Sequence, residues 1–158
     1  MPTLHDGDCV IWDSLAICEY INEQYLDGKG YPNDAGQRAL ARSLACEMHS
    51  GFIAIRSQMS MDIRAEHGAY DSDNTELVKE TQQIDAIWSS DWSEDRGDFL
   101  FGDFGIVDCF FAPVAFRFRT FDVPLSTKAK AYQQTLLALP EMQMWQAEAL
   151  KETATIKA

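Results

Sequence analysis

Apolar and polar positions in the first 25 residues predict a short β-hairpin followed by a helix. The segments Pro2–Leu4 and Cys9–Trp12 have the composition of two strands, and the residues "HDGD" between them are typical of a turn. Apolar residues then recur at helical spacing across Ser14–Tyr25. A two-stranded hairpin alone is only marginally stable in water, so we expect this one to lack the rest of its sheet.

Beyond the Gly- and Pro-bearing stretch "DGKGYPND", the apolar periodicity predicts helices only. The expected helices cover residues 35–63, 75–90, 106–118, 126–139 and 140–152. The segment Ile106–Phe118 is apolar nearly all round, which is typical of a buried helix, and Pro113 inside it predicts a kink. The pattern predicts a mainly α protein of two strands and six helices, divided into a partial domain at 1–27 and an all-helical domain at 28–158.

Composition narrows the class of protein. The 158 residues suit one domain or slightly more, and a hydrophobic content of 46% is enough for a sizeable core. The formal net charge of −12 argues against nucleic acid and against an anionic membrane surface as partners, because both attract Lys and Arg clusters. An anionic small molecule would have to be held locally, by a helix end or by a few placed cations.

The four cysteines predict neither disulfides nor a metal site. Cys9, Cys18, Cys46 and Cys109 form no CxxC pair, and no histidine accompanies them at zinc spacing. Cysteines inside apolar runs behave as small hydrophobic residues, so we expect reduced thiols in a cytoplasmic protein. The first residues show no signal-peptide pattern, and no apolar run reaches the roughly 18 residues of a membrane span.

Asp13 and Ser14 stand at the expected junction between strand and helix, and two interpretations of the pair remain open. Both residue types are favoured helix N-caps, and on pattern alone a simple cap is the better-supported interpretation. A helix N-terminus also binds anions, and Ser14 would add a hydroxyl donor there. Asp13 would instead accept hydrogen bonds from an ammonium group. A ligand with both groups, such as an amino-acid end, would fit the pair.

Gly105 and Asp108 predict how the buried helix begins. Gly105 stands at the N-cap position and Asp108 three residues on, where its carboxylate reaches back to the N-cap amide as in half of a capping box. The expected role of this pair is structural.

Three basic residues recur every seven positions on the expected helix 35–63, namely Arg42, His49 and Arg56. A solvated face paired with the many acids of the chain accounts best for Arg42 and for the nearby Arg38. His49 and Arg56 lie deeper in the helix, near the small residues Ser50 and Gly51, and are better candidates for lining a cleft. A catalytic histidine would need a nucleophile or a metal as partner, and none stands at a recognisable spacing.

Taken in order, several stretches resemble the cytosolic glutathione S-transferases of bacterial type. "MPTL" resembles the family's "VP-x-L" before its third strand, and "VIWDSLAICEYI" resembles its "I-x-[ED]-S-x-A-I-x-x-Y-[LI]". "FLFGDFGIVDCFFAPV" is similar to the family's stretch at its buried sixth helix, and "LPEMQMWQAEAL" is similar to its closing "P-x-x-x-x-W-x-x-x-A". The resemblance covers the whole chain. It implies an all-helical C-terminal domain preceded by a remnant of a thioredoxin-like α/β domain, made of a β-hairpin and a helix.

The resemblance assigns roles to particular residues. Asp13 and Ser14 would hold the γ-glutamyl end of glutathione. Pro2 matches a proline that is cis in the family, although the sequence alone favours a trans Met1–Pro2 bond. The backbone of Met1 would pair with the cysteinyl part of glutathione. The co-substrate site, for an electrophilic small molecule, would be bordered by His49, Phe52 and Arg56. The implied partners are glutathione as a substrate, the electrophile and a second copy of the chain in a homodimer.

Two departures from the family pattern stand out. Gly105 replaces the usual Ser or Thr, so the cap loses a side-chain hydrogen bond. The chain also starts after the family's first βαβ unit, which carries the residue that activates the glutathione thiol. We therefore expect the chain alone to lack a catalytic residue and to be inactive or nearly so. The alternative is a non-catalytic, glutathione-transferase-like module for protein interaction or dimerisation.

Overall fold

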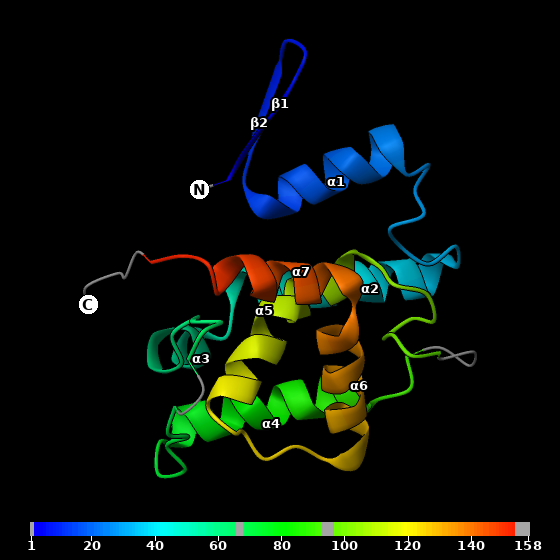
Figure 1. The fold of residues 1–158 in the computed structure, drawn as a ribbon. Helices are drawn as coiled ribbons and strands as arrows, with labels where there is room; N and C mark the ends of the chain where they lie inside the picture. Colours follow the sequence, from blue (N-terminus) through cyan, green and yellow to red (C-terminus); the bar gives the residue numbers. More distant parts are fainter. Residues whose placement is uncertain (1, 66–67, 93–96, 154–158) are drawn as a thin grey trace. The chain divides into compact units, whose positions relative to one another are not determined.

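The chain folds into two compact units, drawn in Figure 1. The computed structural model describes residues 2–65, 68–92 and 97–153. The first unit combines Met1–Gly51 with Asp91–Phe110, and the second combines Phe52–Ser90 with Phe111–Ala158. The domain boundary expected after residue 27 stays a prediction. None of the described helices is both long and apolar enough to cross a membrane.

The first unit begins with the predicted hairpin. Strand β1 (Thr3–Asp6) pairs antiparallel with β2 (Cys9–Trp12), with Thr3 opposite Trp12 and Asp6 opposite Cys9. Strand β1 thus ends two residues later than the predicted strand, which covered Pro2–Leu4. The reason is the turn, which takes only Gly7 and Asp8 because Gly7 adopts a positive φ of 58°. His5 and Asp6 are therefore free to join the ladder.

Helix α1 (Ser14–Tyr25) has the predicted bounds, and it is bonded to the hairpin through Asp6. The Tyr20 hydroxyl donates to Asp6 Oδ2 over 2.9 Å, and the Tyr25 hydroxyl donates to the same oxygen. The bond to Asp6 is the main reason why the pKa of Tyr20 rises to about 12. These two bonds fix the hairpin against α1, in place of the further strands that the hairpin lacks among the described residues.

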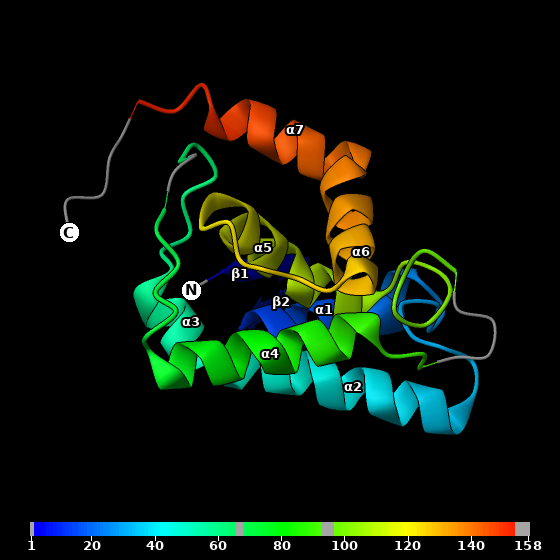
Figure 2. The same cartoon turned by 90° about the horizontal axis from the view of Figure 1, so that it is seen from below.

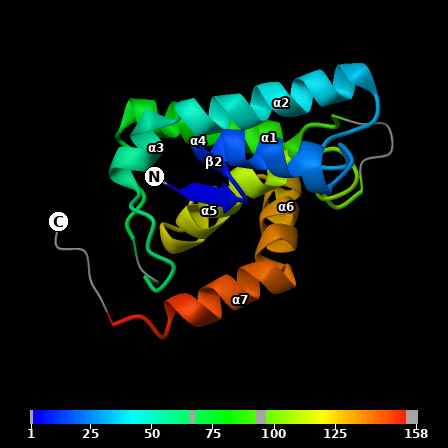
Figure 3. The same ribbon diagram turned by 90° about the horizontal axis from the view of Figure 1, so that it is seen from above.

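Helix α2 (Ala35–Ser50) runs back in the direction opposite to α1, as Figures 1 and 3 show. A cluster of three residues joins the two helices to the connection between them. The buried Tyr31 donates its hydroxyl to Glu19 Oε1 at 2.5 Å, and Arg42 lies 4.9 Å from the centre of the Tyr31 ring. Arg42 also pairs with Glu19 Oε2 at 3.4 Å. The prediction that Arg42 pairs with an acid is confirmed.

The single helix predicted at 35–63 is wrong, because α2 ends at Ser50 and a separate helix α3 (Ile53–Gln58) follows. The break occupies Gly51, which is extended, and Phe52, which has a left-handed backbone with φ 57°. A side chain at Gly51 would place its Cβ 2.8 Å from the Glu47 carbonyl oxygen, so only glycine fits this helix end. The described residues therefore form seven helices rather than the six predicted.

The second unit packs its helices around the indole of Trp88. Helix α4 (Thr75–Ser89) carries Trp88, whose ring lies 5.3 Å from the ring of Phe118 on α5 (Ile106–Thr120). The ring of Tyr132 on α6 (Thr127–Ala138) lies at the same distance from Trp88. All three side chains are at most 2% exposed. Helix α6 contacts α4 and leads into α7 (Pro140–Ala149), which turns away at Pro140 (Figure 2).

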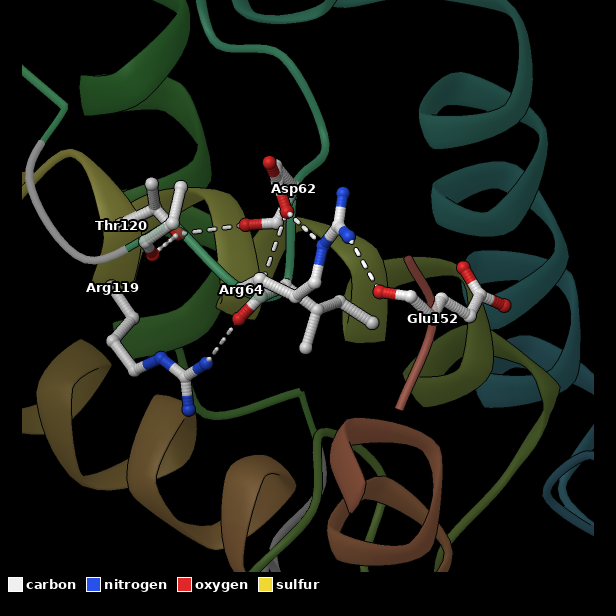
Figure 4. Close-up of polar contacts among 7 residues, drawn as sticks. Asp62, Arg64, Arg119, Thr120 and Glu152 are labelled. Carbon is white, nitrogen blue, oxygen red and sulfur yellow. Dashed lines mark hydrogen bonds and ion pairs between the residues drawn. The ribbon is translucent and has the colours of Figure 1, made fainter. Parts of the chain in front are cut away.

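Side chains of α5 hold the irregular segment 59–65 of the second unit, as Figure 4 shows. The Thr120 hydroxyl lies within hydrogen-bond distance of the carbonyl oxygens of Asp62 (3.4 Å) and Ala65 (3.2 Å). Arg64 in this segment pairs with Asp62 and donates to the Glu152 carbonyl oxygen over 2.9 Å. These bonds supply the partners that a segment without regular secondary structure needs for its backbone groups.

We expect Phe118→Ala to lower the free energy of unfolding of the second unit by about 3–5 kcal/mol, because it removes a fully buried ring beside Trp88. The measurement is urea unfolding followed by tryptophan fluorescence. Phe104→Ala is the matched control, since that ring is 45% exposed and its loss should change stability by less than about 1 kcal/mol. Equal losses in the two variants would contradict this account of the core.

Candidate functional site

Asp13 caps helix α1 with one oxygen of its carboxylate. Asp13 Oδ1 accepts hydrogen bonds from the backbone N–H groups of Leu15 (2.9 Å) and Ala16 (3.3 Å). Loss of solvation alone would raise the pKa of Asp13, but the two amide bonds and the nearby His49 outweigh it, and the net pKa is lowered. Asp13 therefore stays an anion at neutral pH.

The backbone of Asp13 adopts a conformation that L-residues rarely accept, with φ 77° and ψ 132°. Such a conformation costs about 1–3 kcal/mol and persists only where the surroundings enforce it. Here the chain must leave strand β2 and enter α1 within a single residue. The hydrogen bonds of the cap stabilise that sharp change of direction. Strained positions of this kind gather at ligand-binding sites, so the strain supports a role beyond capping.

Ser14, the first residue of α1, presents a hydroxyl and a backbone N–H at the same end of the helix. Its backbone N–H has no hydrogen-bond acceptor among the residues that the structure describes. Together with the partial positive charge of a helix N-terminus, these donors form a place for a carboxylate. Asp13 beside them attracts a cation, so the pair is suited to a ligand that carries both charges.

His49, near the end of α2, lies against this pair. Its Nε2 is 3.0 Å from Asp13 Oδ2, and its Nδ1 is 3.4 Å from Ser14 Oγ. The ring meets Phe110 edge-on, with the ring centres 5.7 Å apart. The side chains of His49 and Asp13 are 31% and 37% exposed, so solvent and small ligands reach both. Sequence reasoning assigned His49 to the co-substrate site and missed this contact, because no motif links two residues 36 positions apart.

Of the other residues predicted for the two sites, Pro2 precedes Thr3, which pairs with Trp12 beside Asp13, whereas Phe52 and Arg56 belong to the second unit. Pro2 is exposed ahead of β1, and Met1 lies outside the described residues, as does its peptide bond to Pro2. Phe52 is buried at the left-handed position before α3, and Arg56 is exposed on α3, both in the second unit. The co-substrate site predicted from His49, Phe52 and Arg56 stays a prediction.

Asp108 forms the bonds of half a capping box at the start of α5. The side chain is fully buried; its Oδ2 accepts from the Gly105 N–H at 2.8 Å and its Oδ1 accepts from the Leu100 N–H at 3.3 Å. A Cβ at Gly105 would lie 2.9 Å from the carbonyl oxygen of Gly30, which itself accepts from Ile106 N–H. Glycine at this position is therefore a steric requirement of the close approach of residue 30.

A cavity of about 370 Å³ in the first unit lies apart from the Asp13–Ser14 pair. It is lined by residues of the segments 29–37 and 101–108, and it includes neither Asp13, Ser14 nor His49. Across the described ranges, no three His, Cys, Asp or Glu side chains gather as a metal ion would require.

Comparisons with known proteins agree with this fold. The chain superimposes on a crystal structure of a glutathione transferase homolog from Burkholderia (strain BGR1), with bound glutathione, at a TM-score of 0.70 and 23% identity over 96% of this chain and 74% of that one. A holo structure of maleyl pyruvate isomerase, a bacterial glutathione S-transferase of the Zeta class, gives a TM-score of 0.61 at 23% identity, covering 98% of this chain and 76% of that one. The chain has the fold of the glutathione transferases, as its motifs predict.

A curated relative is also similar in sequence. The chain is 29% identical over 132 residues to a stringent starvation protein A homolog from Coxiella burnetii. The match covers 82% of this chain and 58% of the relative's length. No known protein-family model matches the chain.

We expect Asp108→Ala to lower the free energy of unfolding by about 3 kcal/mol, because a buried amide and a partly buried amide lose a charged acceptor. Asp108→Asn should fall between this variant and the native chain, since it keeps one acceptor oxygen. The exposed Asp103→Ala is the control. Chemical denaturation checks the order of the four proteins, and a neutral effect of Asp108→Ala would show that the cap does not hold α5.

Proposed function

We propose that this chain is a glutathione transferase family protein that holds the γ-glutamyl end of glutathione at Asp13 and Ser14. The observation that carries the proposal is the junction between β2 and α1, where an anionic carboxylate and two hydrogen-bond donors lie at one helix N-terminus. The strain in the Asp13 backbone gives further support, because it marks a position that the fold maintains at a cost.

The γ-glutamyl end of glutathione carries an ammonium group and a carboxylate on one carbon atom. In the proposed site the ammonium donates to Asp13 Oδ2, while Oδ1 continues to cap α1. The ligand carboxylate accepts from the hydroxyl and the backbone N–H of Ser14. Charge-assisted bonds of this kind are about twice as strong as neutral ones, which suits a partly exposed site.

The comparisons support the choice of ligand. The Burkholderia homolog, which shares the fold, has glutathione bound in its crystal structure. In the reaction proposed for the parent enzyme, the glutathione thiolate, a stronger nucleophile than the thiol, attacks an electrophilic carbon, where it adds across a double bond or displaces a leaving group, and a thioether forms. The electrophile and a homodimeric state belong to the same proposal and rest on the family resemblance.

We expect Ser14→Ala to weaken the binding of glutathione about tenfold, because the ligand carboxylate loses one charged hydrogen bond. Asp13→Asn should weaken binding at least as much, since it removes the charge that attracts the ammonium group. This second variant should still fold, because asparagine is an equally good N-cap and tolerates a positive φ. Isothermal titration calorimetry gives the dissociation constants.

Ser43→Ala is the matched control, because the Ser43 hydroxyl is exposed and donates only to the Ala39 carbonyl of its own helix. It should bind glutathione as the native chain does. If Ser14→Ala matches this control, or if the native chain shows no saturable binding, the proposed site is wrong.

A further inference from the structure

The imidazole of His49 links the two residues of the proposed γ-glutamyl site. Its Nε2 lies 3.0 Å from Asp13 Oδ2, and its Nδ1 lies 3.4 Å from Ser14 Oγ. Asp13 and Ser14 are neighbours at the start of α1, whereas His49 comes from the end of α2, which runs back along α1 to this place (Figure 3). All three residues belong to the first unit. A side chain from a second helix thus contacts both residues that would bind the ligand.

The hydrogen bond between His49 and Asp13 has a defined donor. Asp13 is an anion at neutral pH because its pKa is lowered, and a carboxylate oxygen can only accept a hydrogen bond. Nε2 of His49 therefore carries the hydrogen atom and donates it to Oδ2, whether the ring is neutral or charged. The contact with Ser14 is longer, so the bond to Asp13 is the main one that the ring makes to the site.

The bonds that Asp13 makes leave one direction open to a ligand. A carboxylate offers about two lone pairs on each of its oxygens. Oδ1 accepts from the amides of Leu15 and Ala16, and Oδ2 accepts from His49. Among the described residues, no other group donates to Oδ2. The direction of the remaining lone pair is fixed, because the bonds on both oxygens oppose rotation of the carboxylate.

The ring of His49 is itself supported by packing. It meets Phe110 of α5 edge-on, with the ring centres 5.7 Å apart, and about two-thirds of the His49 side chain is shielded from solvent. A binding group keeps its geometry when the residues behind it are held by packing and by further hydrogen bonds. Phe110 thus supports the imidazole, and the imidazole supports the carboxylate of Asp13.

We propose that His49 is a positioning residue of the γ-glutamyl site, which fixes Asp13 Oδ2 in the direction that the ligand ammonium requires. This inference rests on the proposed function and adds a residue of α2 to it. His49 acts through Asp13 rather than on the ligand. A carboxylate that is fixed before the ligand arrives loses less conformational freedom on binding, so the ligand binds more tightly.

The test is calorimetric titration with two probes, glutathione and glutaryl-cysteinyl-glycine. The second probe is glutathione with its ammonium group replaced by hydrogen. We expect His49→Ala to weaken the binding of glutathione about tenfold, because Oδ2 is no longer held. The same substitution should change the binding of the second probe by less than about threefold, since that probe makes no bond to Oδ2. A general disturbance of the fold would instead affect both probes equally.

Two further variants separate the two contacts of the ring. The side-chain amide in His49→Gln reaches the place of Nε2 and can still donate to Asp13, so the affinity for glutathione should return to within about threefold of the native value. The shorter amide in His49→Asn reaches only the place of Nδ1, beside Ser14. This variant should therefore bind glutathione as weakly as His49→Ala does.

His5→Ala is the matched control, because His5 is exposed on β1 and its loss should leave the binding of both probes unchanged. Circular dichroism shows whether each variant folds, and if His49→Ala does not, the comparison of His49→Gln with His49→Asn decides. The inference is wrong, while the proposed function stands, if His49→Ala binds glutathione at least as tightly as the native chain or weakens both probes equally. Equal binding by His49→Gln and His49→Asn also overturns it. If the native chain itself does not bind glutathione, the proposed function has failed.

Discussion

The two carboxylate oxygens of Asp13 have different partners, and the fold at the start of the first unit depends on this. Oδ1 satisfies two amides that the start of α1 would otherwise leave without partners, and this allows the chain to turn sharply from β2 into the helix. Oδ2 then faces away from the helix toward His49 and solvent. A single carboxylate thus both ends a strained turn and provides an anionic contact point. The two roles use different oxygen atoms.

A second set of close contacts joins helix α1, the backbone at Gly30 and the start of α5. The buried Asn22 of α1 accepts the Gly30 N–H through its side-chain oxygen at 2.7 Å, and the Gly30 carbonyl accepts the Ile106 N–H at 2.9 Å. A Cβ at Gly30 would lie 2.7 Å from Asn22 Oδ1, and one at Gly105 would lie 2.9 Å from the Gly30 oxygen. Both glycines therefore allow α1 and the start of α5 to approach one backbone segment. The replacement of Ser or Thr by Gly105, which looked like a loss in the sequence, is a consequence of this approach.

Much of this could be predicted from the sequence, because caps and helices depend on local residue spacing. The bounds of α1, the bond from Asp108 to the Gly105 amide and the pairing of Arg42 with an acid follow from short-range patterns. The break after Ser50 could not be predicted, because the apolar periodicity continues across it. Only the approach of the Glu47 carbonyl to Gly51 shows why the helix ends there.

The contact of His49 with Asp13 marks the limit of sequence reasoning more clearly. It depends on α2 running back along α1, an arrangement to which the contacts among Tyr31, Glu19 and Arg42 contribute from a distant part of the two helices.

The same tertiary arrangement explains how one residue can serve both as a cap and as part of the proposed ligand site. A carboxylate that only capped a helix would gain nothing from an unusual backbone, since asparagine or serine in ordinary extended geometry caps equally well. At Asp13 the φ of 77° allows the side chain to cap α1 while Oδ2 is held 3.0 Å from His49 Nε2. The strain is thus coupled to the orientation of Oδ2, which the contact with His49 on α2 also holds. In the proposed site an ammonium group would meet a carboxylate that is already in place, which lowers the entropy lost on binding.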